Sequence, residues 1–206
     1  MPSLVGSEMC IRDSGKTTQI KYLKDYLVEK GHEVLCLREP GGTEFGEKLR
    51  SCILNSNSKI HPLAEAHLFA ASRTQLIYEK INPFLENPNN IVILDRYIDS
   101  SFAYQGIARN LGFQTVIDIH QHPPLSLMPD LTFYLNISLE TSYGRQNKRG
   151  NEKDYFEKEK DSFYKQLILG FEECLTRFPT RFKSIDAEKD VELVHKSIIS
   201  HLAGAS

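Results

Sequence analysis

The chain has 206 residues, of which 40% are hydrophobic and 25% are charged, and its formal net charge is −2. This is the composition of an ordinary globular domain, and the near balance of charge excludes a broad basic surface for nucleic acid. No apolar run is long enough to cross a membrane, and the N-terminus lacks the pattern of a signal peptide. Four cysteines lie far apart without a Cys-x-x-Cys pair, so we predict a cytoplasmic protein whose thiols are reduced: Cys10, Cys36, Cys52 and Cys174.

The first nine residues make a poor strand. They contain Pro2 and Gly6, and only Leu4 and Val5 are aliphatic neighbours. Proline cannot donate to a strand ladder, and glycine has no side chain to pack. The sequence therefore predicts a weak or distorted first strand.

Residues 14–18 form the second half of a phosphate-binding P-loop. Such a loop reads Gly-x-x-x-x-Gly-Lys-Ser/Thr, and Gly15, Lys16 and Thr17 occupy its last three positions, whereas Cys10 stands at the first glycine. The loop runs into a helical pattern that Gly31 ends, and a helix N-terminus favours a polyphosphate. Lys16 is then expected to reach the β- and γ-phosphates and Thr17 to bind Mg²⁺. A chance Gly-Lys-Thr at the start of a helix is the alternative.

A strand is predicted at 33–37, and a glycine-rich turn follows it directly. Arg38 and Glu39 stand at its carboxyl end, and Pro40 with the next two glycines forces a turn that lets the backbone approach a ligand. Ligands of parallel sheets bind at the carboxyl ends of strands. We therefore predict a substrate site here, with an ordinary Pro-Gly turn as the alternative.

Helical patterns follow at 44–54 and 63–84. In the second, Phe69 and Arg73 are four residues apart and share one face. An aromatic ring and a guanidinium on one face can stack on a base and hydrogen-bond it. From this spacing alone, a core phenylalanine and a solvated arginine are the more probable interpretation.

The run at 91–94 is apolar throughout, as in a strand that is buried on both faces. Asp95 follows at its carboxyl end, where a carboxylate can hold Mg²⁺ directly or through water. Arg96 offers a planar fork for a phosphate. An ion pair at the end of the strand is the alternative.

The second half of the chain continues the alternation, with helical patterns at 113–120, 139–149, 157–178 and 191–202 and strands at 131–135 and 182–185. His120 and His122 precede two prolines without a third metal ligand, so we interpret both as surface residues. The mixed-charge run from 144 onward is typical of a solvated helix face, or of a lid, at about 144–158, that closes over phosphates. Strands that alternate with helices predict an α/β fold with a parallel sheet.

From residue 14 to about 202 the chain resembles the thymidylate kinase family of P-loop nucleoside-monophosphate kinases. The motifs that carry this resemblance are SGKTTQ, REPGGT, FAASRTQ, DRYIDSSFAYQG, PDLTFYLN and the basic Arg145…Arg149-Gly150 segment. The resemblance implies a single domain over 1–206, with a three-layer P-loop kinase fold, a five-stranded parallel sheet and a short basic lid. It also implies a homodimer that uses ATP and Mg²⁺ to phosphorylate dTMP to dTDP.

The resemblance also implies a role for each matching residue. Thymine would stack on Phe69 and be read by Arg73 and Gln105, with Tyr104 against the sugar. The dTMP phosphate would be held by Arg50 and Arg96. The remaining implied roles are catalysis by Lys16, Asp95, Arg96 and Arg149; ATP binding by Ser14, Gly15, Lys16, Thr17, Thr18 and Arg145; further substrate contacts by Arg38, Glu39 and Pro40; and metal binding by Thr17 and Asp95.

Residues 1–13 depart from the family pattern. The family has Gly-x-Asp/Glu-Gly where this chain has Cys10, Arg12 and Asp13, and residues 2–13 look like translated adapter sequence. We interpret 1–13 as a non-native segment joined to a kinase body, with a divergent natural N-terminus as the alternative. Three functions stay open: a working dTMP kinase, a nucleotide-binding module or pseudokinase impaired by the altered loop, and another P-loop small-molecule kinase.

Overall fold

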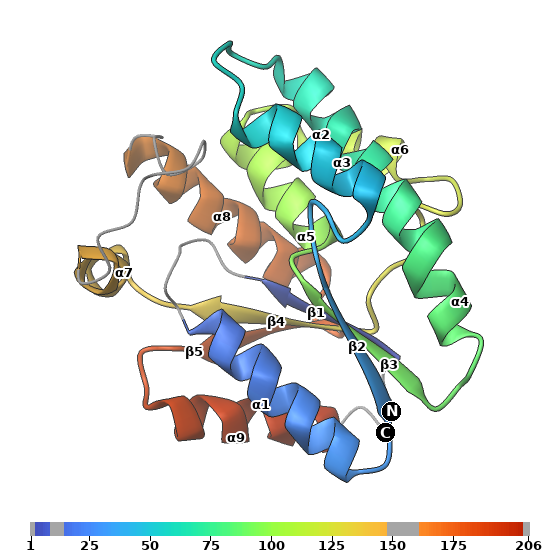
Figure 1. Ribbon diagram of the computed structural model, residues 1–206. Helices are drawn as coiled ribbons and strands as arrows, with labels where there is room; N and C mark the ends of the chain where they lie inside the picture. Colours follow the sequence, from blue (N-terminus) through green and yellow to red (C-terminus); the bar gives the residue numbers. More distant parts are fainter. Residues whose placement is uncertain (1–2, 9–14, 148–160, 204–206) are drawn as a thin grey trace.

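The computed structural model describes residues 3–8, 15–147 and 161–203, and these form a parallel sheet between two layers of helices (Figure 1). The strands are β1 (Leu4–Glu8), β2 (Glu33–Arg38), β3 (Asn90–Asp95), β4 (Leu131–Asn136) and β5 (Phe182–Asp186). Their order in the sheet is β2-β3-β1-β4-β5, and every neighbouring pair is parallel. The predicted three-layer α/β fold with a five-stranded sheet is confirmed.

The helices divide between the two faces of the sheet. On one face lie α1 (Lys16–Glu29) and α9 (Val191–Ala203), and the other face carries α2 (Glu44–Leu54), α3 (Pro62–Leu76), α5 (Ile98–Ser101), α6 (Phe113–Ile119) and α8 (Asp161–Arg177) (Figure 1). The π-helical turns η1 (Ile77–Ile81) and η2 (Phe102–Ala108) continue α3 and α5, α4 (Asn82–Leu85) follows η1, and α7 (Leu139–Asn147) follows β4. The predicted helices at 44–54, 63–84, 113–120 and 191–202 correspond to these elements within a few residues. The ends of the other two predicted helices, 148–149 and 157–160, lie outside the described residues.

The two core clusters follow the alternation of side chains along the strands. Tyr134 and Phe182 pack toward α8, where Phe171 stacks on Tyr134 with 4.9 Å between ring centroids. Phe133 and Ile185 point to the opposite face and pack with residues of α1 and α9. Burial on both faces explains why the β3 and β4 sequences are apolar almost throughout.

The prediction of a weak first strand is wrong. β1 is the middle strand of the sheet, all five of its residues are buried, and it pairs in register with both β3 and β4. Gly6 lies against Thr132, where an added Cβ would come within 2.9 Å of Oγ1, so the missing side chain permits this close approach. The Asp130 carboxylate accepts hydrogen bonds from the backbone of Ser3 and Leu4, which fixes the start of the strand. Tertiary contacts therefore override the weak local propensity.

No helix among the residues that the structure describes is long and apolar enough to cross a membrane.

Candidate active site

The P-loop helix and strand β3 bring Lys16 and Asp95 together. Gly15 has a φ of +85°, a left-handed conformation that favours glycine, and it turns the chain into α1. Lys16, the first residue of α1, is buried and forms an ion pair with Asp95 at the carboxyl end of β3. Thr17 and Thr18 follow on the first turn with exposed side chains, whereas Ser14 lies outside the described residues. The strand-end ion pair and a left-handed glycine at the start of α1 are therefore both present.

The charge of Lys16 is only partly compensated. Burial, and then the charge of the nearby Arg96 guanidinium, lower the pKa of its ammonium group to about 8, against the opposing effect of Asp95. Lys16 and Arg96 place two cations at the end of the sheet, where the Asp95 and Glu8 carboxylates also lie. Because the pKa of Glu8 is raised to about 7, its carboxyl group is only partly ionised at neutral pH, and the two cations can hold an additional anion.

Glu8 is a buried acid at this edge that the sequence interpretation missed. Its Oε1 atom accepts the backbone N–H groups of Tyr97 and Ser100 at 2.7 and 3.1 Å, and the Ser100 hydroxyl donates to Oε2 at 2.5 Å. Burial, together with the negative charge of Asp99, raises the pKa of Glu8 to about 7. Glu8 thus ties the end of β1 to the chain that follows Arg96. The position of Glu8 just before the P-loop was the sequence feature that could have identified it as a site residue. Because the first strand was predicted to be weak, nothing indicated that Glu8 would be buried.

Arg96 holds an unusual backbone conformation beside the ion pair. Its φ of +68° is in the left-handed region, which costs energy for a residue with a Cβ. Its guanidinium lies over the ring of Tyr104, 5.2 Å from the centroid, and Nη1 is 3.4 Å from the Ser100 hydroxyl. The turn therefore aims a half-buried guanidinium at the same edge of the sheet as Lys16.

The predicted turn after β2 lies next to this edge. Glu39 donates its backbone N–H to the Asp95 carbonyl at 3.0 Å, so the ends of β2 and β3 are held together. Arg50, on α2, donates to the Pro40 carbonyl at 3.0 Å. Arg38 is exposed and pairs with the Glu47 carboxylate at 3.2 Å, and Glu47 also accepts the Gly42 N–H. Arg38 and Arg50 thus project from the elements that border the turn.

Arg73 is fully buried, which contradicts the solvated arginine that spacing alone favoured. Its guanidinium donates to Glu39 Oε2 through Nε at 2.8 Å and through Nη2 at 2.6 Å. Both Nη atoms lie 3.1 Å from the Ser101 hydroxyl, and Nη1 is 2.7 Å from His120 Nε2. The ring of Tyr97 lies beneath it, 5.0 Å from the centroid.

The interpretation of His120 as a surface residue is also wrong, because its side chain is 4% exposed. The contact with Arg73, 47 positions away, cannot be inferred from spacing. His122 is exposed, as expected.

The other residues expected to read the base lie nearby in the fold. Gln105 is buried on η2 and donates to Glu65 Oε1 on α3 at 2.8 Å. Tyr104, its neighbour, is 8% exposed and packs between Arg96 and the ring of Phe163. Phe69 is half-buried on α3, one turn before Arg73.

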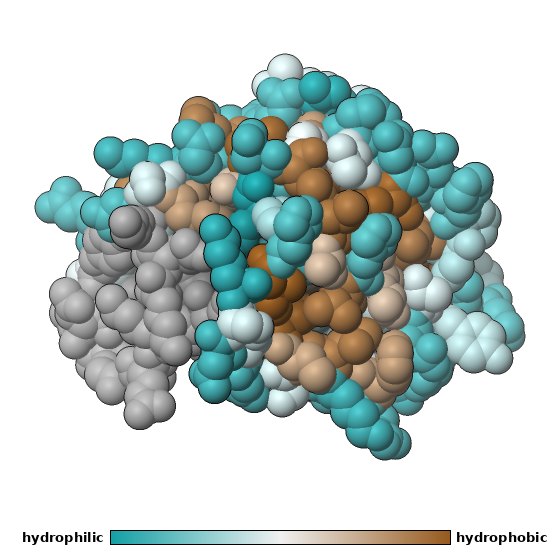
Figure 2. Space-filling view, turned by 90° about the horizontal axis from the view of Figure 1, so that it is seen from above, coloured by the Kyte–Doolittle hydropathy of each residue, from teal (hydrophilic) through white to brown (hydrophobic). Residues whose placement is uncertain are grey.

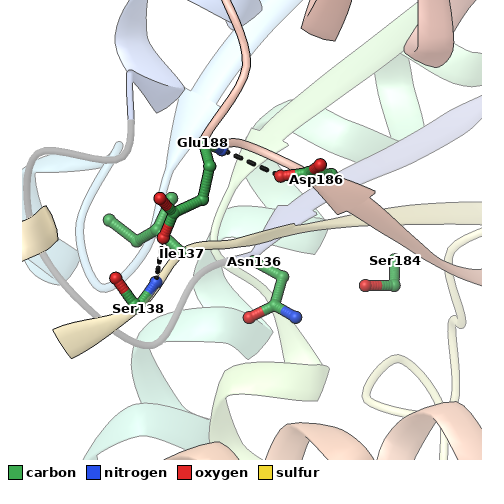
Figure 3. Close-up of a pocket in the computed structure, with 6 residues that line it drawn as sticks. All are labelled: Asn136, Ile137, Ser138, Ser184, Asp186 and Glu188. Atoms are coloured by element: carbon green, nitrogen blue, oxygen red, sulfur yellow. Dashed lines mark hydrogen bonds between the residues drawn. The ribbon is translucent and has the colours of Figure 1, made fainter. Parts of the chain in front are cut away.

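A polar cavity of about 300 Å³ opens at the carboxyl ends of β4 and β5 (Figure 3). Asn136 and Asp186 line it from the strand ends, and Ser138 and Glu188 line it from the loops that follow; Ile137 and Ser184 complete the lining. Glu188 accepts the Ser138 N–H at 2.8 Å and the Thr141 hydroxyl at 2.9 Å, which joins the loop after β5 to the start of α7. Arg145 lies on α7, and its side chain and Arg149 lie outside the described part of the chain.

These features define a P-loop nucleotide-binding kinase: a helix that begins at a Gly-Lys-Thr, a carboxylate on the neighbouring strand, and arginines around one edge of a parallel sheet. The family model for thymidylate kinase matches residues 11–198. The chain belongs to the thymidylate kinase family.

Individual relatives agree with this assignment. A thymidylate kinase of Thermoanaerobacter sp. (strain X514) is 44% identical over 185 residues, which cover 90% of each chain. The thymidylate kinase of Bacillus licheniformis is 44% identical over 187 residues, covering 90% of this chain and 88% of the relative. The crystal structure of thymidylate kinase from Ehrlichia chaffeensis superposes with a TM-score of 0.77 at 28% identity, over 97% of both chains. None of these comparisons favours another P-loop small-molecule kinase or a binding module without turnover.

Proposed function

We propose that the chain catalyses the ATP-dependent phosphorylation of dTMP to dTDP. The observation that carries the proposal is the meeting of Lys16, Asp95 and Arg96 at one edge of the sheet, in a chain of the thymidylate kinase family. A 5′-phosphate oxygen of dTMP forms a bond to the γ-phosphorus of ATP. The bond from this phosphorus to the β–γ bridging oxygen breaks, and ADP leaves with that electron pair.

Catalysis at this site would consist of positioning and charge stabilisation. The acceptor phosphate is already anionic, so no strong general base is required. Lys16 would exchange part of its contact with Asp95 for the β- and γ-phosphates, whose charge raises the pKa of the ammonium group and keeps it protonated. Arg96 would hold the acceptor phosphate beside the donor, and Arg149 would stabilise the transferring group.

The residues present fit a Mg²⁺ ion that is shared with ATP. The Asp95 carboxylate is 31% exposed and the Thr17 hydroxyl is exposed, so both can reach an ion between them and the phosphates. Magnesium in kinases is commonly held by one or two carboxylates together with substrate phosphates and water. Within the described ranges no three His, Cys, Asp or Glu side chains gather into a site of their own. When bound, the ion would neutralise phosphate charge.

Substrate selection would rest on the buried cluster behind the turn at Pro40. Phe69 would stack on thymine, and Arg73 and Gln105 would read its polar edge. Tyr104 would lie against the sugar where a 2′-hydroxyl would clash, and its 8% exposure supports a tight fit there. Arg50 would assist Arg96 on the phosphate, and Arg38, Glu39 and Pro40 would complete this side of the site.

The other end of the site would hold the adenine of ATP. The polar cavity at the carboxyl ends of β4 and β5 supports this assignment, since it lies at the same edge of the sheet as Lys16 (Figures 1 and 3). Arg145, from α7, would lie near the base, and residues 144–158 would act as the lid. Ser14, Gly15 and Thr18 would contribute to the phosphate cradle with Lys16 and Thr17.

We also propose a cytoplasmic homodimer. Apolar side chains gather on the face that carries α2 and α3 (Figure 2), and Phe45 on α2 is 48% exposed. A second copy of the chain would cover this face. The described cysteines are free thiols, in keeping with a reducing compartment: Cys36, Cys52 and Cys174. Light scattering at several protein concentrations tests the dimer, which a constant monomer mass would contradict.

The assay that tests the function measures dTDP formed from ATP, Mg²⁺ and dTMP. The parent protein should form dTDP, and Lys16→Met should reduce the rate by at least about 100-fold because it removes a charge from the transferring phosphates. Lys21→Met, an exposed position on the same helix, is the matched control and should leave the rate unchanged. A preference for AMP over dTMP as acceptor would contradict the proposal.

A further inference from the structure

We propose that His120 is a positioning residue for base recognition, which orients the Arg73 guanidinium by accepting a hydrogen bond at Nε2. The proposal rests on the proposed function, in which Arg73 reads thymine. His120 stands at the end of α6, and none of the sequence motifs includes it.

The neighbours of His120 determine which ring nitrogen carries the proton. Nδ1 is 2.7 Å from the Val116 carbonyl, which can only accept, so Nδ1 carries the hydrogen. Nε2 is 2.7 Å from Arg73 Nη1, which can only donate, so Nε2 is the acceptor. Both contacts are buried, and together they hold the ring in one orientation and one tautomer.

The acceptors around Arg73 divide its N–H groups into two sets. Glu39 takes Nε and Nη2 in charge-assisted hydrogen bonds, which are the stronger ones. Among the described residues the acceptors of Nη1 are neutral, the Ser101 hydroxyl and the His120 ring, and the second N–H of Nη2 also points to the Ser101 hydroxyl. All five N–H groups are thereby used, so a thymine carbonyl must take one of them over. The Nη1 end is released most readily because its partners are neutral.

His120 therefore sets the direction of the donor that a base carbonyl would share. Its ring must be neutral to do so, because an imidazolium has no lone pair to offer and would repel the guanidinium. Burial, and then the charge of Arg73, lower the pKa of His120 to about 4, so the ring is neutral at physiological pH. The charged and titratable groups that meet at this point are Arg73 from α3, Glu39 after β2 and Tyr97 before α5, and the Glu8 carboxyl group at the end of β1 also acts on Arg73.

Calorimetric binding of dTMP and of ATP to matched variants tests the proposal. His120→Leu removes the acceptor, and we expect dTMP to bind at least about 10-fold more weakly, since about 1.4 kcal/mol corresponds to that factor. ATP should bind within twofold of the parent. His120→Gln, whose side-chain oxygen can accept near the position of Nε2, should bind dTMP within threefold. His122→Leu, an exposed histidine two positions away, should bind both nucleotides like the parent.

A second measurement needs no variant. In nitrogen-15 spectra of the histidine rings, His120 should show a protonated Nδ1 and an unprotonated Nε2, and its Nε2 signal should shift on addition of dTMP but not of ATP. A protonated Nε2 overturns the proposal, even where His120→Leu fails to fold.

Two results on the variants also overturn it: parent-like dTMP affinity in His120→Leu, or equal loss in His120→Gln and His120→Leu. Both results can be distinguished from failure of the proposed function. In that case the parent protein itself binds no dTMP, and substitutions at position 120 change neither dTMP binding nor ATP binding.

Discussion

Arg73 is a fully buried arginine that we propose reads the base of the substrate. The free energy cost of removing its charge from water is offset by the Glu39 carboxylate and by two neutral acceptors. Burial raises the pKa of Glu39, against the opposing effect of the neighbouring Arg73. The two residues therefore act as one unit, and neither can be removed without leaving the other charge uncompensated.

Replacing Arg73 should separate the two nucleotides. Arg73→Ala is expected to weaken dTMP binding far more than ATP binding, and to lower stability by about 3–5 kcal/mol because Glu39 is left buried and unpaired. Arg73→Lys keeps the charge but loses the planar fork, and should still weaken dTMP by at least about 10-fold. Titration calorimetry with each nucleotide measures this. Equal losses for dTMP and ATP would show that Arg73 does not read the base.

Glu8 should give the stability of the protein a distinct pH dependence. Its pKa is raised to about 7 from an ordinary 4.5, so between these values the folded state binds more protons than the unfolded state. The free energy of unfolding contributed by Glu8 is therefore full below about pH 4.5 and falls as the pH rises to 7, by about 3 kcal/mol at most.

Glu8→Gln should remove this slope, because the amide oxygen can still accept the Tyr97 and Ser100 N–H groups and has no charge to bury. Urea denaturation from pH 4.5 to 7.5 measures it, with the exposed Glu29→Gln on α1 as the control. Parallel profiles for the parent and Glu8→Gln would contradict the prediction.

At the scale of elements, the packing of α8 against η2 supports the base site. A Cβ added to Gly170 on α8 would lie 2.6 Å from the Ala103 Cα, so only glycine permits this approach. η2 carries Tyr104 and Gln105, so a displacement of α8 would reach the residues that we propose line the substrate. The contact therefore links core packing to recognition.

Gly170→Ala should destabilise the protein by about 1–3 kcal/mol through overpacking. Gly144→Ala on α7 is the matched control, because nothing described lies within 4 Å of its added Cβ and alanine favours a helix. Thermal unfolding of the two variants distinguishes these effects. An unchanged melting temperature for Gly170→Ala would mean that η2 moves aside without loss of free energy.

At the scale of the whole molecule, the part of the N-terminus that departs from the family pattern is the phosphate loop and not the first strand. β1 completes the sheet, so residues 3–8 need no replacement, and the altered positions that remain are Cys10, Arg12 and Asp13, outside the described residues. A Cβ at the first loop glycine costs about 1–3 kcal/mol or opens the loop. In the proposed phosphate loop, Asp13 would add a negative charge near the phosphates, and Arg12 would replace the acid that the family resemblance assigns to a contact with the sugar.

The combined change Cys10→Gly, Arg12→Asp and Asp13→Gly should therefore raise the rate of dTDP formation by at least roughly two orders of magnitude, since each factor of ten needs about 1.4 kcal/mol. The parent and the repaired protein are compared side by side at saturating ATP and dTMP. Equal rates would show that the loop tolerates these residues.

Local patterns along the chain predicted most of this architecture and the charged edge of its site. The apolar run before Asp95, the Gly-Lys-Thr before a helical period and the turn after Arg38 are all readable from neighbouring residues. Parallel strands then bring their carboxyl ends to one edge, so Lys16 and Asp95 meet without further information.

Tertiary structure alone decided the rest. The weak propensity of β1 is overridden by two neighbouring strands and by Asp130, which lies more than 120 positions away. Arg73 and His120 are buried because each supplies the hydrogen-bonding partner that the other needs, across 47 positions. The spacing of residues in the sequence shows which side chains share one face of a helix. The hydrogen-bonding partners of a buried polar group come from other helices and strands, which only the tertiary structure places next to it.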